Sequence, residues 1–160
     1  MTSPGSTCRT AITSTDFYPT LLDLCGEPLR PGQHMDGISL VPMLEDPQSP
    51  NSRKAIHWHY PHYGNQGGAP CSAIRMGDWK LIEWFEDESV ELFNLAEDPG
   101  ETRDRSTDEP ERAASMRAAL LSWREDVGAN LPRPNPDHDP ASAIRHHEQA
   151  NRSAVQGKWR

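Results

Sequence analysis

The sequence predicts an α+β fold, in which a small antiparallel sheet of three to four strands carries a C-terminal amphipathic helix packed on it. Two patterns lead to this prediction. Over residues 55–95, short segments rich in β-branched and aromatic side chains are separated by tight-turn sequences, as in consecutive antiparallel strands. Over residues 113–127, apolar side chains recur at helical spacing, as in a helix that covers one face of a sheet.

The composition suggests that only the middle of the chain folds. Its 160 residues match one domain, but only 34 % are hydrophobic and the formal charge is −8. We therefore expect a flexible arm at residues 1–13 and a proline-rich, largely disordered tail at 130–160. The negative charge argues against nucleic-acid and anionic-membrane partners, because no basic stripe is present to displace counterions.

Residues 14–50 are expected to form one helix followed by a long irregular connection. Thr15 or Asp16 can cap the helix, and Gly26 should end it. The connection is rich in proline, and its apolar patch at residues 40–44 is expected to dock on a larger body. The apolar residues that recur at helical spacing in the helix are Phe17, Leu21 and Leu24.

Residues 51–129 should hold the sheet and the terminal helix. In the first strand, Ala55–Tyr60, side chains alternate between the two faces, so His57 and His59 share one face. The pair Gly77-Asp78 fits a two-residue hairpin turn with glycine first, where a positive φ is required. The other strands are expected at residues 72–76, 79–85 and 90–95, with the last turn at 87–89.

The terminal helix is expected to begin with a capping box of Asp108 and Glu111, with Pro110 in its first turn. Gly128 should end it. Its apolar stripe should pack on the sheet as part of the core rather than form a cofactor site. The residues of this stripe are Ala113, Met116, Leu120, Trp123 and Val127.

The segment His57–Tyr63 is the strongest candidate for a binding site, because it combines three imidazoles, two phenols and an indole. Imidazoles bind metals or anions near neutral pH, and aromatic rings with a polar tip suit sugars or aromatic ligands. With the adjoining amide-rich loop, the segment is expected to form a substrate-contacting wall. The expected substrate-binding residues are His59, His62, Tyr63, Asn65 and Gln66.

Two other interpretations of the three histidines stay open. His57 and His59 share a strand face and His62 is near, which would supply three nitrogens for zinc. Against zinc, Pro61 redirects the chain and no carboxylate is evident to orient the imidazoles. Alternatively, the histidines are structural and form hydrogen bonds within the domain interface.

Arg75 and three tryptophans also have a functional and a structural interpretation. Arg75 could bind an anion, but we expect it to pair with Glu83 or Glu91 across the sheet. The tryptophans could form a sugar platform, although packing between sheet and helix also explains them. They are Trp58, Trp79 and Trp84. The pair His146-His147 is too isolated to predict a metal site.

The cysteines predict no disulfide framework and no zinc ribbon, since Cys8, Cys25 and Cys71 are widely spaced and lack a C-x-x-C motif. Cys25 follows several leucines and is expected to be buried. Residues 1–13 lack the apolar core of a signal peptide, and no segment reaches transmembrane length. The localisation therefore stays unknown.

Several phrases of the sequence resemble, in this order, the segment that follows the catalytic core of sulfatases. The resemblance covers about residues 13–140, and the order and spacing of the phrases identify the C-terminal portion of an arylsulfatase-type enzyme of the alkaline-phosphatase-like superfamily. The phrases are STDFYPTLL at 14–22, DGISL at 36–40, HWHYPHY at 57–63, SAIRMGDWKLI at 72–82, ELFNL at 91–95, DPGE at 98–101 and PNP at 134–136.

The resemblance implies an α/β enzyme that hydrolyses sulfate esters. Its nucleophile is a formylglycine made from the cysteine of a Cys-x-Pro-Ser-Arg motif, and a divalent cation, usually calcium, holds the sulfate. None of the three cysteines here begins that motif, and the family's adjacent aspartates are missing. We therefore expect no catalytic residue, metal ligand or cofactor in this chain, and an N-terminal sulfatase core as its partner. Full-length relatives are often periplasmic or secreted.

Three functions are consistent with the sequence. In the first, the chain packs on the sulfatase core and shapes the pocket for a sulfated carbohydrate or an aryl sulfate, and it is inactive alone. In the second, it is a stand-alone, non-catalytic glycan-binding module. In the third, it is a non-functional gene remnant. The low apolar content and the proline-rich stretch at 27–50 favour the first or third, and both predict marginal stability for the isolated chain.

Overall fold

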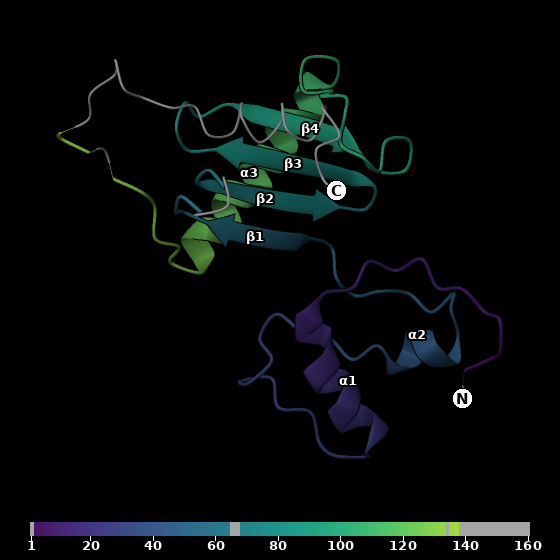
Figure 1. The fold of residues 1–160 in the computed structure, drawn as a ribbon. Coiled ribbons are helices and arrows are strands. Elements are labelled where there is room, and N and C mark those ends of the chain that lie inside the picture. The colour runs from purple at the N-terminus through teal and green to yellow at the C-terminus, as the bar shows by residue number, and fades with distance from the viewer. Residues whose placement is uncertain (1, 65–67, 134, 138–160) are drawn as a thin grey trace. The chain divides into compact units, whose positions relative to one another are not determined.

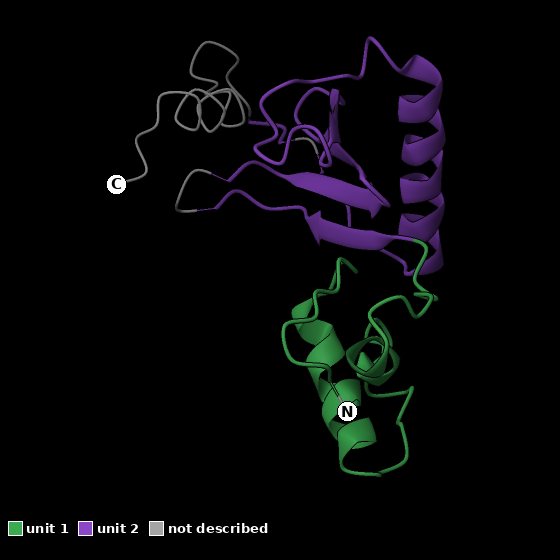
Figure 2. Cartoon of the chain, turned by 90° about the vertical axis from the view of Figure 1, so that its right-hand side faces the viewer, with its two compact units in different colours: residues 1–54 green, residues 55–160 purple. Residues whose placement is uncertain are grey.

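The computed structural model describes residues 2–64, 68–133 and 135–137. The chain divides into two compact units, residues 1–54 and residues 55–160 (Figure 2). Most of the predicted tail, residues 138–160, lies outside the described residues. In the described part of the chain, none of the helices has the length and apolar character that a membrane crossing requires.

Unit 1 is built from a 3-10 turn, η1 (Ser14–Asp16), and two helices, α1 (Phe17–Leu24) and α2 (Val41–Glu45). The predicted helix is confirmed, and Gly26 follows it with a φ of +71°. The prediction of an irregular connection is wrong at α2, where Pro42 lies in the first turn and Met43 is buried. Cys25, the C-cap residue of α1, is exposed, contrary to expectation.

A buried carboxylate organises unit 1. Asp16 is fully buried and forms an ion pair with Arg53, which comes from the end of the unit. The Asp16 carboxylate also accepts hydrogen bonds from the backbone N–H groups of Thr13 (2.8 Å) and Ile38 (3.0 Å). Burial by itself disfavours the charged form, but these donors outweigh it and lower the pKa of Asp16 below its ordinary value. Asp16 thus ties three distant segments together.

Gly37 lies against the start of α1, where a side chain would not fit. A Cβ atom at this position would come within 2.2 Å of the Thr15 carbonyl oxygen and 3.2 Å of Pro19. The absence of a side chain lets the backbone approach closely enough for Ile38 to reach Asp16. The DGISL phrase therefore serves the packing of unit 1.

Unit 2 contains a four-stranded antiparallel sheet in the order β1-β2-β3-β4, followed by helix α3 on one face (Figures 1 and 2). Each strand pairs with the next along the chain, so the sheet is a simple meander. The predicted fold class is confirmed. The strands are β1 (Ile56–Tyr60), β2 (Cys71–Met76), β3 (Trp79–Trp84) and β4 (Val90–Asn94), and the helix is α3 (Pro110–Asp126).

The hairpin turns have the expected backbone chemistry. Met76 pairs with Trp79 across the two-residue turn, and Gly77 has a φ of +58°. In the turn between β3 and β4, Glu88 takes a φ of +57° and the Trp84 N–H donates to the Ser89 carbonyl oxygen. These local signals explain why the strand positions follow from the sequence.

The core of unit 2 lies between α3 and the central strands. Its buried members are Ile74, Leu81, Leu92, Ala113, Met116 and Leu120. Trp123 packs against this cluster, whereas Val127 lies beyond the helix and is 54 % exposed. The predicted capping box is wrong, since Glu109 is the N-cap and the Asp108 carboxylate pairs with Arg105 instead. Gly128 ends the helix with a φ of +61°.

Candidate functional site

The aromatic and imidazole side chains of β1 divide between the two faces of the sheet. His57 and His59 point toward α3, as the strand alternation predicts, and both rings contact Trp123. Trp58 and Tyr60 lie on the opposite face, where they are 46 % and 51 % exposed. The segment therefore does not act as one surface.

His59 is held through both nitrogens of its ring. Nδ1 lies 2.7 Å from the Ser72 hydroxyl, and Nε2 lies 2.7 Å from the carbonyl oxygen of Asn130. A carbonyl oxygen only accepts, so Nε2 donates to Asn130, and Nδ1 shares a hydrogen bond with the Ser72 hydroxyl. His59 thereby joins β1, β2 and the segment after α3.

His57 packs flat on the indole of Trp123, with ring centroids 4.5 Å apart and an interplanar angle of 3°. This contact explains the placement of His57 by packing between β1 and α3. His62, in contrast, lies past the end of the strand and is exposed. Within the described residues, no group of three or more His, Cys, Asp or Glu side chains is arranged to hold a metal ion.

The exposed part of the segment follows the end of β1. His62 packs edge-on against the ring of Tyr60, with centroids 5.6 Å apart. Tyr63 is 58 % exposed, and its hydroxyl donates a 3.0 Å hydrogen bond to the Glu86 carboxylate. Partial burial and the Glu86 carboxylate raise the pKa of the Tyr63 phenol, so it stays a neutral donor.

A loop adjoins these side chains, and its base is closed by a 2.8 Å hydrogen bond from the Gly64 N–H to the Gly68 carbonyl oxygen. The Phe85 N–H donates to the Pro70 carbonyl oxygen, which fixes the return of the chain beside β3. Asn65 and Gln66, predicted to contact substrate, lie outside the described residues. The structure thus brings His62, Tyr63 and Glu86 to one end of the sheet.

Arg75 does not form the predicted cross-strand ion pair. Its Nε donates to the Gly77 carbonyl oxygen at 3.0 Å, and its cross-strand partner on β3 is Lys80. Glu83 is on the opposite face of the sheet, where α3 engages it, and Glu91 accepts a hydrogen bond from the Trp84 indole. The register of the sheet therefore excludes the expected pairing.

The three tryptophans cannot form one platform. Trp58 and Trp84 lie on the face opposite α3, whereas Trp79 packs against the core on the α3 face. The guanidinium of Arg112, from α3, lies 4.4 Å above the Trp79 ring, a cation–π contact. Trp79 is explained by packing, and a platform would be limited to the opposite face.

An ion cluster that the sequence did not predict joins β3 to α3. Glu83 is 3 % exposed and pairs with Arg117 at 2.7 Å and with Arg124 at 2.6 Å. Arg124 is itself 7 % exposed, and its guanidinium lies 5.2 Å from the centre of the Phe85 ring. The sequence spacing indicates this cluster in retrospect. Arg117 and Arg124 lie on the same helix face as Leu120, and Glu83 lies on the same strand face as Leu81.

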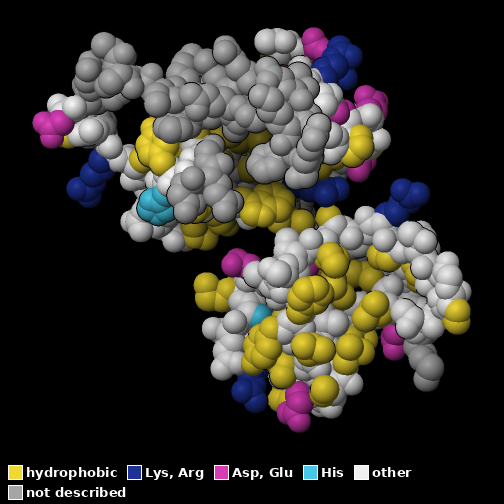
Figure 3. All heavy atoms as spheres, in the orientation of Figure 1, with side chains coloured by type: hydrophobic (Ala, Val, Ile, Leu, Met, Phe, Trp, Pro, Cys, Tyr) yellow, Lys and Arg dark blue, Asp and Glu magenta, His cyan; other side chains and the backbone are white. Residues whose placement is uncertain are grey.

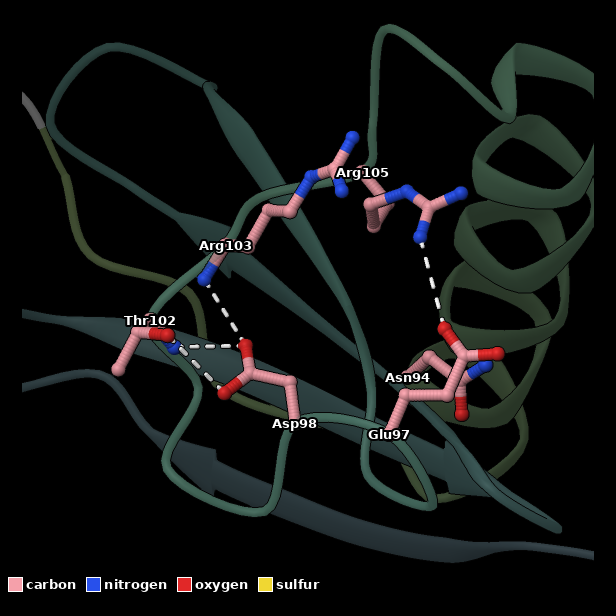
Figure 4. A pocket seen from close by; sticks show the side chains of 6 residues that line it. All are labelled: Asn94, Glu97, Asp98, Thr102, Arg103 and Arg105. Atoms are coloured by element: carbon pink, nitrogen blue, oxygen red, sulfur yellow. Dashed lines mark hydrogen bonds and ion pairs between the residues drawn. The ribbon is translucent and has the colours of Figure 1, made fainter.

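A hollow of about 270 Å³ lies beside the turn after β4, where charged groups are already paired (Figure 4). The Asp98 carboxylate accepts hydrogen bonds from the backbone of Thr102 and Arg103. These donors lower the pKa of Asp98, the Arg103 N–H most of all. Glu97 and Arg105 form an ion pair across the hollow. The DPGE phrase thus forms a turn whose polar groups hydrogen-bond or pair with neighbouring residues. These contacts give the turn a structural role.

The described residues do not fit the catalytic centre that sulfate-ester hydrolysis requires. Cys8 and Cys25 are exposed free thiols, and burial raises the pKa of the Cys71 thiol, which disfavours its thiolate. Calcium needs six to eight converging oxygen ligands, whereas Asp16 and Asp98 each bind donors of their own surroundings. We therefore derive no catalytic step from these residues.

Comparison with known proteins gives a consistent result. Residues 1–125 match the family model for the C-terminal region of N-sulphoglucosamine sulphohydrolase. A sulfatase of Formosa agariphila is 36 % identical over 121 residues, which are 68 % of this chain and 22 % of that protein. Arylsulfatase K of Mus musculus is 31 % identical over 134 residues, which are 76 % of this chain and 24 % of that protein.

A solved structure supports the same relationship. The protein BT4656, in complex with its substrate D-glucosamine-2-N,6-O-disulfate, is 28 % identical, with a TM-score of 0.60. The match covers 73 % of this chain and 24 % of that protein. The chain therefore spans only about a quarter of the length of the proteins it matches.

Proposed function

Because this chain belongs to the sulfatase family and matches its C-terminal region, we propose that it forms one wall of the substrate pocket of a sulfate-ester hydrolase. Full-length sulfatases contain an N-terminal catalytic core, and the chain is proposed to pack on such a core. In this proposal the chain contributes to substrate recognition and not to bond cleavage.

The observation that supports the proposal most is the exposed pair His62 and Tyr63 at the end of β1. An imidazole and a neutral phenol, next to the hydrogen bond between Gly64 and Gly68, can donate and accept hydrogen bonds with the hydroxyl, amide or sulfate groups of a ligand. His59 is proposed to fix the position of this strand end, since both its nitrogens already bind the chain. Asn65 and Gln66 stay in the proposed site by their place in the sequence.

The catalytic groups are proposed to reside in the core. The resemblance implies a formylglycine nucleophile and a calcium ion there, and these groups would supply the attack on sulfur and the stabilisation of its oxygens. The residues of this chain would orient the organic part of the ester and exclude water from that side of the pocket.

The proposed substrate class is the sulfate ester of a carbohydrate or an aryl alcohol. One relative binds a disulfated glucosamine, and others are arylsulfatases. Exposed aromatic and imidazole groups suit the faces and hydroxyls of either class. Comparing kcat/KM for a carbohydrate sulfate and an aryl sulfate would distinguish the two substrate classes.

The proposal can be tested with a chimera in which residues 1–160 replace the matching C-terminal region of the Formosa agariphila sulfatase. Sulfate release is measured with a sulfated glucosamine and with an aryl sulfate. We expect His62→Ala and Tyr63→Ala to raise KM about tenfold for the preferred ester, because each removes one ligand contact. We expect little change in kcat, since neither side chain touches the reacting sulfur.

The control is Glu125→Gln, because Glu125 is an exposed residue of α3 that lies outside the proposed site. An unchanged KM in both site variants, with a functional chimera, would contradict the proposed wall. Sulfate release by the isolated chain would contradict the assignment of catalysis to the core. Retention of sugar affinity by the isolated chain would instead favour a stand-alone glycan-binding module.

A further inference from the structure

A phenol and a carboxylate form a hydrogen-bonded pair at the exposed end of the sheet. The Tyr63 hydroxyl donates to a Glu86 carboxylate oxygen at 3.0 Å, and both residues are exposed. The backbone holds the two partners near each other. Phe85, the neighbour of Glu86, donates its N–H to the Pro70 carbonyl oxygen, which ties the end of β3 to the segment that returns from the Tyr63 loop.

This hydrogen bond decides which polarity Tyr63 offers to a ligand. A phenol has a single proton to donate, and here that proton is donated to Glu86. Partial burial and the Glu86 charge raise the pKa of the Tyr63 phenol, so the proton is retained. The phenol oxygen can still accept a hydrogen bond. Toward a ligand Tyr63 is therefore an acceptor, which suits a hydroxyl or an amine and not a sulfate or carboxylate oxygen, because such an oxygen only accepts.

The charge of Glu86 acts in the same direction. A ligand group that accepts from His62 or donates to Tyr63 lies within a few ångströms of this carboxylate. Such a separation is shorter than the screening length of about 8 Å at physiological ionic strength, so salt does not remove the interaction. A second anionic group of the substrate is repelled there, whereas an ammonium group is attracted.

We infer that Glu86 is a specificity-determining residue of the proposed wall. Glu86 orients the Tyr63 hydroxyl and adds a negative charge beside it. The pair thereby selects sulfate esters that present a hydroxyl or an amine to this wall, against esters that present a second sulfate or a carboxylate. The inference rests on the proposed function, and it names the substrate class within it.

The test uses the Formosa agariphila chimera and two sugars, glucosamine 6-O-sulfate with its free ammonium group and the 2-N,6-O-disulfate that BT4656 binds. The inhibition constant of each sugar is measured against the ester that the chimera cleaves best. We expect the monosulfated sugar to bind about tenfold more tightly than the disulfated one. Glu86→Gln keeps an oxygen that accepts from Tyr63 and removes the charge, so we expect it to reduce this preference to about threefold or less.

Tyr63→Phe tests the acceptor role of the phenol oxygen. This variant keeps the ring and removes the hydroxyl, so we expect affinity for the monosulfated sugar to fall about fivefold. Affinity for the disulfated sugar should stay unchanged, because its added sulfate receives no hydrogen bond from Tyr63. An equal loss of affinity for both sugars would contradict the acceptor role.

Glu111→Gln is the matched control, because it makes the same charge change at the opposite end of the sheet. Glu111 is exposed and lines a hollow beside Met76 and Trp79, which close the turn between β2 and β3. We expect it to leave the preference between the two sugars unchanged. An unchanged thermal midpoint of each variant shows that its fold is intact.

Two results would overturn the inference. One is a preference that Glu86→Gln leaves unchanged, and the other is equal or tighter binding of the disulfated sugar by the unmodified chimera. Failure of the proposed function itself looks different, since His62→Ala and Tyr63→Ala would then keep a normal KM. If only the inference fails, those two variants still raise KM.

Discussion

At the scale of single residues, the packing of unit 1 depends on Asp16 and Gly37. Asp16 gathers the N–H groups of two segments and the guanidinium of a third, and Gly37 permits the close approach that one of those contacts needs. Neither residue is apolar, so neither would be chosen as a core position from its hydropathy. Their importance arises because a short helix with an exposed apolar face has little else to stabilise it.

Gly37→Ala should destabilise unit 1 by about 2 kcal/mol, a typical result of forcing extra volume into a tight contact. The new Cβ atom would lie 2.2 Å from the Thr15 carbonyl oxygen. Hydrogen exchange of the Ile38 and Leu40 amides should accelerate accordingly. Gly32→Ala is the control, because no atom lies within 4 Å of its Cβ position, and it should leave exchange unchanged. Equal exchange in both variants would mean that the Thr15 contact is not tight.

Unit 1 should lose stability in acid through Asp16. Its pKa is lowered in the folded state, so its contribution is present above the unfolded value of about 3.9 and is lost as pH falls below it. Thermal unfolding from pH 7 to pH 2.5, followed by far-UV circular dichroism, should show this loss. In Asp16→Asn the neutral-pH stability should be lower and the acid-dependent part smaller. An identical pH dependence in wild type and Asp16→Asn would assign the acid sensitivity to other carboxyl groups.

At the scale of elements, the strands and the main helix could be predicted, whereas several contacts between elements could not. The β1–β4 meander follows from local signals, since alternation and the Gly77 turn are encoded within a few residues. Helix α2 and the N-cap at Glu109 depend on what packs nearby, which a local pattern does not contain. The predicted pairing of Arg75 with Glu83 or Glu91 is wrong for the same reason. The face and register of the strands decide which charged side chains are neighbours.

The ion cluster of Glu83, Arg117 and Arg124 couples β3 to α3. Glu83→Ala should destabilise unit 2 by about 3–5 kcal/mol, because it leaves the buried Arg124 guanidinium without its counter-charge. Urea unfolding followed by tryptophan fluorescence measures the change. Glu109→Ala breaks an exposed pair with Arg112 and should cost less than about 1 kcal/mol. Equal losses in the two variants would contradict a specific role for burial.

At the scale of the whole molecule, the two units have different degrees of self-sufficiency. Unit 2 encloses its own apolar cluster, whereas unit 1 leaves most of its large apolar side chains in water. The resemblance to sulfatases could be predicted from the order of its phrases, and the family comparison confirms it. The site was less predictable, because alternation separates His59 from Tyr60, and only the fold shows that the loop end, with His62 and Tyr63, stays exposed.

The isolated chain should be marginally stable. Its free energy of unfolding should lie below about 5 kcal/mol, under the usual range of autonomous domains, because Phe17, Leu21 and Leu24 of α1 are exposed and gain nothing from burial. Hydrophobic side chains gather on the face of unit 1 that Figure 3 shows. Urea unfolding observed by circular dichroism and by tryptophan fluorescence reports on the whole chain and on unit 2, respectively. A single cooperative transition with a higher free energy in both signals would show that the chain is a complete domain.

The most direct measurement is a crystal structure of the Formosa agariphila chimera with a sulfated monosaccharide bound. We expect a polar atom of His62 or Tyr63 at about 2.7–3.2 Å from a ligand oxygen or nitrogen, with the nucleophile and cation contributed by the core. A ligand bound in the catalytic core with both side chains beyond contact, and the end of β1 facing solvent, would contradict the proposed role of this chain in substrate recognition.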